Sequence, residues 1–410
     1  MKTIIRILPI FLGPIGTQFS LIFSGVLISR MVGVFDRGTL AIFMVLISLS
    51  VIFGGTAASQ LASIYSTIES REKVFFGIIN KIKYFMLSAS IFMSLLMLIS
   101  LKSFFVSVTV FLAINSQITT SILIGIMRGK KQFIQSSILQ ISQPFLFSVI
   151  ITVSYLTIKL NILQIITLWT VLYFFVALIG FSMIIGLDKL RLNYKKDNTA
   201  LFPDFRSRSF KSFLSTYSPL ESYRIDQLLN YLMFSASGLG LYVTGVAFAN
   251  ASKLIGQSLS GLVPNWLLDK NGKFMTKIIY SSSACLIVGV IFSILGKISI
   301  VWIFGNQFQE AEKLVVPLAL SGGFMGIRTI LVEVYRVQQK EIVATRMEVC
   351  AFLFYLFLII IFKSQGDQVF ICWALFMASA LSVALLTIYQ FYIYRISKRR
   401  YLTSHSKVRL

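Results

Sequence analysis

Long apolar runs alternate with short polar segments along the whole chain. Runs of about 20 residues, each long enough to cross roughly 30 Å of hydrocarbon as an α-helix, recur from the first residues to near the last. This pattern predicts an all-α polytopic membrane protein. The first run continues past any small-residue cleavage site, so we expect it to be a span and not a cleaved signal peptide.

The apolar runs predict about twelve spans, which we expect at about 7–29, 38–60, 84–101, 103–127, 133–158, 162–186, 213–236, 239–268, 278–303, 314–336, 343–362 and 368–394. The connection 187–212 is longer than the others, basic and polar. We interpret it as a cytoplasmic linker between an N-terminal lobe (1–186, helices 1–6) and a C-terminal lobe (213–394, helices 7–12). A basic cytoplasmic tail, 395–410, follows.

Composition and charge support this organisation. The chain has 410 residues, of which 56% are hydrophobic and 13% charged, and its mean hydropathy of +0.83 excludes an ordinary soluble protein. Of the 38 Lys and Arg residues, 28 lie on the side of the N-terminus, six lie in the opposite connections and four lie within spans. The positive-inside rule therefore places both termini in the cytoplasm. The net charge of +23 then reflects topology and attraction to anionic lipids, and nucleic-acid binding is not expected.

Residue types that bind cofactors are sparse. Cys285, Cys350 and Cys372 lack paired spacing, and the single histidine, His405, lies in the tail. This pattern argues against a disulfide framework and a metal site, and no glycine-rich phosphate-binding loop follows a predicted strand. We expect no cofactor and no enzymatic activity, with coupling to H⁺, Na⁺ or the membrane potential left open.

The two predicted lobes begin with similar stretches. At an offset of 205 positions, 13–43 aligns with 218–248 without a gap, so that Pro14 meets Pro219 and Gly33 meets Gly238. We interpret the match as a repeat with a proline early in the first helix of each lobe and a glycine in the following turn. Two six-span repeats are related by an axis along the membrane normal. Chance similarity between apolar helices is the alternative.

The stretch SPLESYRIDQLLNYLMF (218–234) carries Glu221, Arg224 and Asp226 within one predicted span. Each charge costs roughly 2.5–3.5 kcal/mol at a bilayer centre, so charges that remain there are functional candidates. On a helical wheel the leucines share one face and polar groups cover most of the other, although Glu221 breaks this division. Glu221 can pair with Arg224, whereas a partner for Asp226 must come from another helix or from water. The pattern favours the wall of a polar cavity, and a buried ion pair that only fixes helix packing is the alternative.

Other charged residues extend the candidate site. Lys253 and Arg328 fall within spans and, with Arg224, suit an anionic solute, because guanidinium groups bind phosphate bidentately and lysine acts as a point charge. Glu333 lies five residues from Arg328 and is not expected to pair with it. At the outer end of the first helices, Arg30, Asp36 and Arg37 are candidates for a gate or rim, and an exposed loop with no special role is the alternative. Arg37 is more readily explained as an exposed loop residue.

Three stretches, in this order, resemble Wzx-type flippases of the multidrug/oligosaccharidyl-lipid/polysaccharide exporter superfamily. They are ISRMVGVFDRGTLAIFMV (28–45), YRIDQLLNYLMFSASGLGLYVTGVAFA (223–249) and IFGNQFQEAEKLVVPLAL (303–320). The resemblance implies two six-helix lobes around a central cationic cavity with alternating access. It also implies a substrate, an undecaprenyl-diphosphate-linked oligosaccharide such as an O-antigen repeat unit, which moves across the bacterial inner membrane in lipopolysaccharide biosynthesis.

The resemblance and the charges together give a set of roles. Arg224, Lys253, Arg328 and Arg30 are predicted to bind the substrate, and Asp226, Glu221, Glu333 and Asp36 to act in coupling or gating. The expected partners are the lipid-linked oligosaccharide, membrane lipids and other polysaccharide assembly proteins. A cation-coupled drug exporter of the same superfamily is the nearest alternative. A membrane glycan polymerase or ligase is less favoured, because the outer loops are short and no histidine lies near the membrane.

Overall fold

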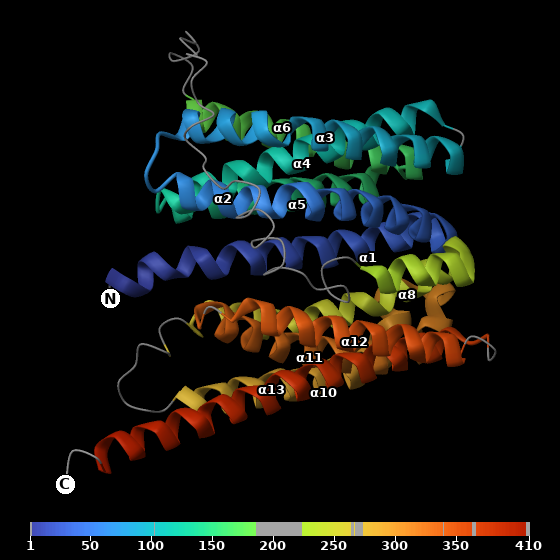
Figure 1. Cartoon of the computed structure of the whole chain (residues 1–410). Helices are drawn as coiled ribbons and strands as arrows, with labels where there is room; N and C mark the ends of the chain where they lie inside the picture. Colours follow the sequence, from blue (N-terminus) through green and yellow to red (C-terminus); the bar gives the residue numbers. More distant parts are fainter. Residues whose placement is uncertain are drawn as a thin grey trace. The chain divides into compact units, whose positions relative to one another are not determined.

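The computed structural model describes residues 2–101, 103–185, 224–263, 266, 274–338, 340–362 and 366–406, and the elements within these ranges are all helices. Contacts divide the chain into two compact units (Figure 1). Unit 1 comprises Met1–Ala247 and Gly296–Leu314, and unit 2 comprises Phe248–Leu295 and Val315–Leu410. The predicted linker and Glu221 lie outside the described residues, and the division into two six-helix lobes stays a prediction.

Unit 1 is built mainly from the N-terminal half of the chain. Its elements are α1 (Lys2–Val51), the π-helix η1 (Ile52–Thr56), α2 (Ala57–Tyr65), α3 (Arg71–Leu101), α4 (Phe104–Gly129), α5 (Phe133–Thr157), α6 (Ile162–Ile185) and the 3₁₀-helix η4 (Asn306–Ala311). Three further helices, α8 (Ile225–Ser260), α10 (Phe274–Phe304) and α11 (Glu312–Val337), contribute residues to both units. Among the described residues, ten helices are long and apolar enough to cross a membrane.

Helix α4 lies at the centre of unit 1, because it contacts α1, α2, α3, α5 and α6. Its apolar positions are buried on several sides and include Ile114, Ile118 and Ile122. Buried hydroxyls on this helix are satisfied locally, as when Thr120 Oγ1 donates to the Ser116 carbonyl at 2.8 Å. With buried residues on several sides and contacts to five helices, α4 is covered by its neighbours.

Helix α1 contains two helical segments joined at Gly33, where φ is +80° and ψ is −179°. In Figure 1 the first segment runs from the N-terminus to one end of unit 1, and the chain then returns toward α2. This backbone conformation is accessible almost exclusively to glycine. One residue thus makes the whole connection between the first two predicted spans, so the loop expected at 30–37 is much shorter than predicted.

Helix α8 is interrupted in the same way at Ser235, where φ is +64° and ψ is −172°. The prediction that Gly238 forms this turn is wrong, since Gly238 lies within regular helix and the chain reverses three residues earlier. The two turn residues, Gly33 and Ser235, are 202 positions apart and not 205. Two apolar helices can be aligned almost equally well at several offsets, so a gapless alignment between them can be wrong by a few residues. Pro144 and Pro317, which also lie inside helices, do not interrupt them.

The residues after the two turns pack closely against each other. A Cβ atom on Gly38 would lie 1.7 Å from the Ala236 carbonyl oxygen, and one on Gly240 would lie 2.1 Å from the Val34 carbonyl oxygen. The two contacts have the same form, and each pair of equivalent residues is again 202 positions apart. Glycine is the residue that permits such an approach between two helix backbones.

Replacing Ser235 by glycine is expected to stabilise the protein by about 1 kcal/mol. A non-glycine residue in this region of backbone space costs about 1–3 kcal/mol, and part of that gain is offset by the greater freedom of glycine in the unfolded chain. Thermal unfolding of the purified protein in detergent measures the change. Ser282→Gly, within regular α10 helix, is the control and should destabilise. A variant S235G that is less stable than the wild type contradicts the strained turn.

Unit 2 has its own core. In addition to its parts of α8, α10 and α11, it contains α12 (Glu341–Phe362) and α13 (Gln368–Ser406). Tyr335 on α11 is fully buried, and its Oη donates to the Leu386 carbonyl of α13 at 2.6 Å. Around it pack Ile330, Leu331 and Val334. Helix α13 continues to Ser406, so most of the predicted tail is helical.

Candidate functional site

The start of α8 buries its polar face. Asp226 is 6% exposed, and Gln227 and Asn230 are also buried, whereas Leu232 on the other face is 69% exposed. In a soluble protein, Leu232 would be expected in the core and the polar residues at the surface. A helix with lipid on one side and polar groups on the other shows this inverted distribution, which agrees with the wheel drawn from the sequence.

The Asp226 carboxylate has a partner on the returning segment of α8. Tyr242, which is fully buried, donates its hydroxyl to Asp226 Oδ2 at 2.6 Å, and the turn at Ser235 brings the two side chains together. Asn230 Nδ2 donates to the Asp226 backbone carbonyl at 3.2 Å. A partner for Asp226 was expected from another helix or from water; Tyr242 lies on α8 itself, after the interruption at Ser235, and its hydrogen bond stabilises the buried charge.

Arg224 connects Asp226 to two helices of the N-terminal part. It directly precedes α8 with φ at +48°, and it interacts electrostatically with Asp226 and with Tyr173 of α6. Tyr173 in turn accepts a hydrogen bond at 3.3 Å from Gln117 Nε2 of α4. We refer to these five residues, Gln117, Tyr173, Arg224, Asp226 and Tyr242, as the Arg224 cluster. Gln117 and Tyr173 were not predicted, although side-chain amides within an apolar span, here Asn115 and Gln117, are a visible signal.

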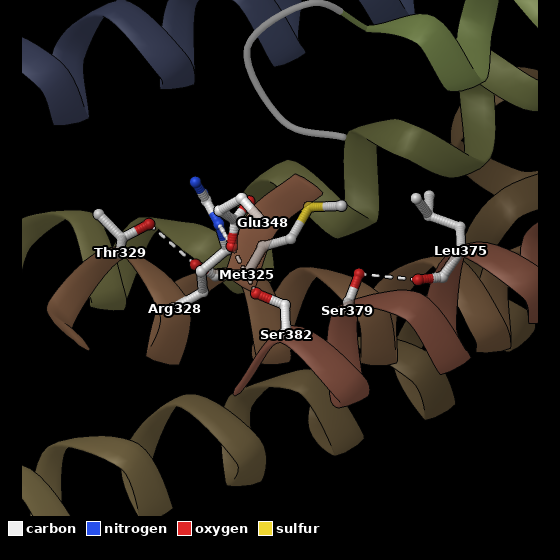
Figure 2. Close-up of polar contacts among 7 residues, drawn as sticks. All are labelled: Met325, Arg328, Thr329, Glu348, Leu375, Ser379 and Ser382. Atoms are coloured by element: carbon white, nitrogen blue, oxygen red, sulfur yellow. Dashed lines mark hydrogen bonds and ion pairs between the residues drawn. The ribbon is translucent and has the colours of Figure 1, made fainter. Parts of the chain in front are cut away.

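Arg328 belongs to a separate buried cluster inside unit 2. Figure 2 shows the side chains of Arg328 (α11), Glu348 (α12) and Ser382 (α13) pointing toward one another. Arg328 Nε lies 2.6 Å from Glu348 Oε1, and the Ser382 hydroxyl donates to the same oxygen at 2.5 Å. Arg328 is 7% exposed and Glu348 is 1% exposed. We refer to these three residues as the Glu348 cluster.

Helix α12 carries Glu348 into the interior because of its place on the buried face. The buried positions of this helix recur every three or four residues, and they are Ala344, Glu348, Ala351, Tyr355, Leu358 and Ile359. A carboxylate in the middle of this stripe cannot reach water and needs a cation on a neighbouring helix. Glu348, which lies in the predicted span 343–362, was not among the acids predicted to act in coupling or gating. The signal was present in RMEVCAFLFYLF, where one acid interrupts a strongly apolar run.

The remaining predicted site residues lie elsewhere. Arg30 is exposed and donates to the carbonyls of Ile303 at 2.7 Å and Trp302 at 2.5 Å, near the C-terminus of α10, where a cation is favourable. Glu333 pairs with Arg336, one turn along α11, at 2.5 Å. Lys253 and Asp36 are half-buried. None of these placements tests a role in transport.

Arg37 differs from its expected position in an exposed loop. It is 9% exposed, whereas Arg30 is the exposed residue of the two. The physical reason is the short turn at Gly33, after which helix resumes and draws Arg37 into the protein.

Within the described residues, no group of three His, Cys, Asp or Glu side chains is placed to hold a metal ion. The two described clusters consist of cations, hydrogen-bonded acids, hydroxyl groups and an amide.

No protein-family model matches the sequence, and no curated protein matches it significantly. Solved structures do share its fold. A lipid II flippase, MurJ, in an inward closed conformation has a TM-score of 0.69 at 15% identity, covering 94% of this chain and 87% of that chain. An inward-facing multidrug resistance transporter of the MATE family and MOP superfamily has a TM-score of 0.67 at 10% identity, with coverages of 92% and 96%.

The eukaryotic MATE transporter AtDTX14 gives a TM-score of 0.63 at 16% identity, and the alignment covers 94% of this chain and 95% of that one. Identities this low show the fold alone. The all-helical, multi-pass membrane architecture predicted from the sequence is thereby confirmed. The count of twelve spans stays a prediction, although α1 and α8 each contain two helical segments.

Proposed function

We propose that this protein is a flippase that moves an undecaprenyl-diphosphate-linked oligosaccharide, such as an O-antigen repeat unit, across the bacterial inner membrane by alternating access. The observation that carries the proposal is the inverted start of α8, which holds Arg224 within a buried polar cluster. A guanidinium group suits the diphosphate of such a lipid. The fold shared with a lipid II flippase supports a lipid-linked substrate.

In this proposal Arg224 engages the diphosphate, and Gln117 and Tyr173 lie beside it with amide and hydroxyl groups suited to sugars. Asp226 then carries the coupling charge, as H⁺ or Na⁺, because its carboxylate is buried and bonded to Tyr242. The membrane potential adds about 2.3 kcal/mol per charge moved across 100 mV. Both termini lie in the cytoplasm, and other polysaccharide assembly proteins supply and consume the substrate.

A cation-coupled drug exporter is the second candidate function. The MATE-family structures that share the fold support it, as do the two buried acids, Asp226 and Glu348. A drug exporter needs acids and aromatic groups to hold cationic compounds, whereas a lipid diphosphate needs cations. The role of Arg224 therefore separates the two proposals.

The variant Arg224→Ala is expected to abolish surface glycan display in cells that lack the native copy, while the protein remains in the membrane. Quantitative glycan staining and an immunoblot of the membrane fraction measure the two quantities. Lys159→Ala, at an exposed position, is the matched control and should display normal glycan. Normal surface glycan display in R224A would contradict the proposal that Arg224 engages the substrate of a flippase. Normal display combined with loss of ethidium efflux in Asp226→Asn supports the drug exporter instead.

A further inference from the structure

Arg37 is a buried cation for which the described residues provide no acid. It is 9% exposed, and its Nε is enclosed without a hydrogen-bond partner. The adjacent carboxylate, Asp36, forms no ion pair with it in the structure. Consecutive residues on a helix point about 100° apart, so Asp36 does not face the guanidinium. Arg328 and Arg224, in contrast, each interact with a carboxylate.

The surroundings of Arg37 leave room for its head group. Its Nη2 lies 3.0 Å from the position that a Cβ on Gly25 would occupy, so any other residue at 25 would crowd the guanidinium. Gly25 precedes the turn at Gly33, and Arg37 follows it, so the side chain lies between the two segments of α1. The Gly25 carbonyl already accepts a hydrogen bond from the Ser29 hydroxyl at 2.8 Å. Arg37 is therefore not required to satisfy that carbonyl.

A buried guanidinium with no counter-charge is costly to keep. The desolvation of an unpaired ion amounts to several kcal/mol even after the protein relaxes, and an apolar side chain of similar volume would avoid it. Natural chains tolerate such costs mainly at functional sites. Arg37 is buried but keeps 9% of its surface exposed, so a small part of the residue remains accessible. These features favour a partner that is not part of the protein.

We propose that Arg37 is an anion-binding residue that takes one phosphate group through its guanidinium fork. The planar donors match phosphate oxygens bidentately, and the low-polarity surroundings strengthen the contact. Two sources carry this chemistry: the headgroup phosphate of a bilayer phospholipid, and the diphosphate of a lipid-linked sugar. The second source rests on the proposed function. Binding of a phospholipid headgroup does not depend on the proposed function, so Arg37 can bind phosphate even if the transported substrate is a different one.

The test uses the full chain purified in detergent micelles. A thiol-reactive fluorophore reports unfolding, because Cys285 and Cys372 are buried. The probes are inorganic pyrophosphate and, separately, phosphatidylglycerol added to the micelles. The wild type is expected to unfold at a higher temperature with a phosphate-bearing probe. Arg37→Met is expected to unfold at a higher temperature than the wild type without probe, and to show no further rise with it.

Two further variants make the result specific. Lys159→Met removes an exposed cation and should keep the full response. Arg37→Lys keeps the charge but loses the fork, so its response should weaken. A response to phosphatidylglycerol alone assigns the phospholipid as the source, and a response to pyrophosphate assigns the diphosphate. An equal response in R37M and the wild type, or no response in the wild type to either probe, overturns the proposal. None of these readouts depends on transport.

Discussion

Replacing Arg328 by alanine is expected to lower the free energy of unfolding by about 3–5 kcal/mol. The change leaves Glu348, which is 1% exposed, buried without the cation that lies 2.6 Å from it. Breaking one side of a buried ion pair costs this much because the remaining charge loses its partner and gains no water. Ser382 still donates one hydrogen bond to the carboxylate, but a neutral donor does not replace a full charge. Unfolding in detergent of the purified variant measures the loss.

Removing both charges is expected to restore most of this stability. The double variant Arg328→Met with Glu348→Leu fills the same space with apolar groups, and such replacements are often neutral or stabilising. A double-mutant cycle with the two single variants then gives the coupling energy directly. Additive losses would mean that the two side chains do not interact, contrary to the geometry in Figure 2.

The same cycle separates packing from transport. A double variant that is stable but inactive assigns the Glu348 cluster a part in the transport cycle, whereas one that is stable and active assigns it to helix packing. Arg328 was predicted to bind substrate, and its pairing with Glu348 means that a substrate anion would have to compete with a carboxylate. The more accessible cation for that role is Arg224, which is half-buried and belongs to the Arg224 cluster.

The helices themselves were predictable because their limits are set by solvent. The span predicted at 103–127 is α4, Phe104–Gly129, and the span predicted at 343–362 is α12, Glu341–Phe362. An apolar run ends where charges begin, and the thickness of the hydrocarbon fixes its length. Helix α3 departs from this rule, since it begins at Arg71 and not near 84. Its first turns are amphipathic, and a hydropathy window does not detect the buried stripe of Val74, Ile78 and Ile82.

The contents of the two clusters were less predictable, because they depend on which helices face each other. Over the described residues 225–234 the wheel agrees with the buried polar face, whereas Arg224, which the wheel placed on the helix, lies before it. Nothing in this stretch indicates that Tyr173 or Gln117 is a neighbour. Arg37 was misplaced for a different reason: a turn made by Gly33 alone has no sequence signature that separates it from a loop of several residues. Partner choice across helices is a tertiary property, and local patterns carry no information about it.

Replacing Gly38 by alanine is expected to destabilise unit 1 by about 3 kcal/mol, the upper end of the cost of overpacking a core. The new methyl group would lie 1.7 Å from the Ala236 carbonyl oxygen, and that oxygen belongs to a helix backbone that cannot rotate away. The two helical segments must therefore separate. Gly240→Ala should have a similar effect, because its methyl group would lie 2.1 Å from the Val34 carbonyl oxygen.

The combination of Gly38→Ala and Gly240→Ala is expected to cost less than the sum of the two single variants. Once the segments have moved apart for one methyl group, the second enters space that is already open, so the two changes couple. Gly16→Ala is the matched control, because its methyl group would meet only the flexible side chain of Ile141, at 3.2 Å. Equal stability of the Gly38 and Gly16 variants would mean that the backbones after the two turns are not in contact.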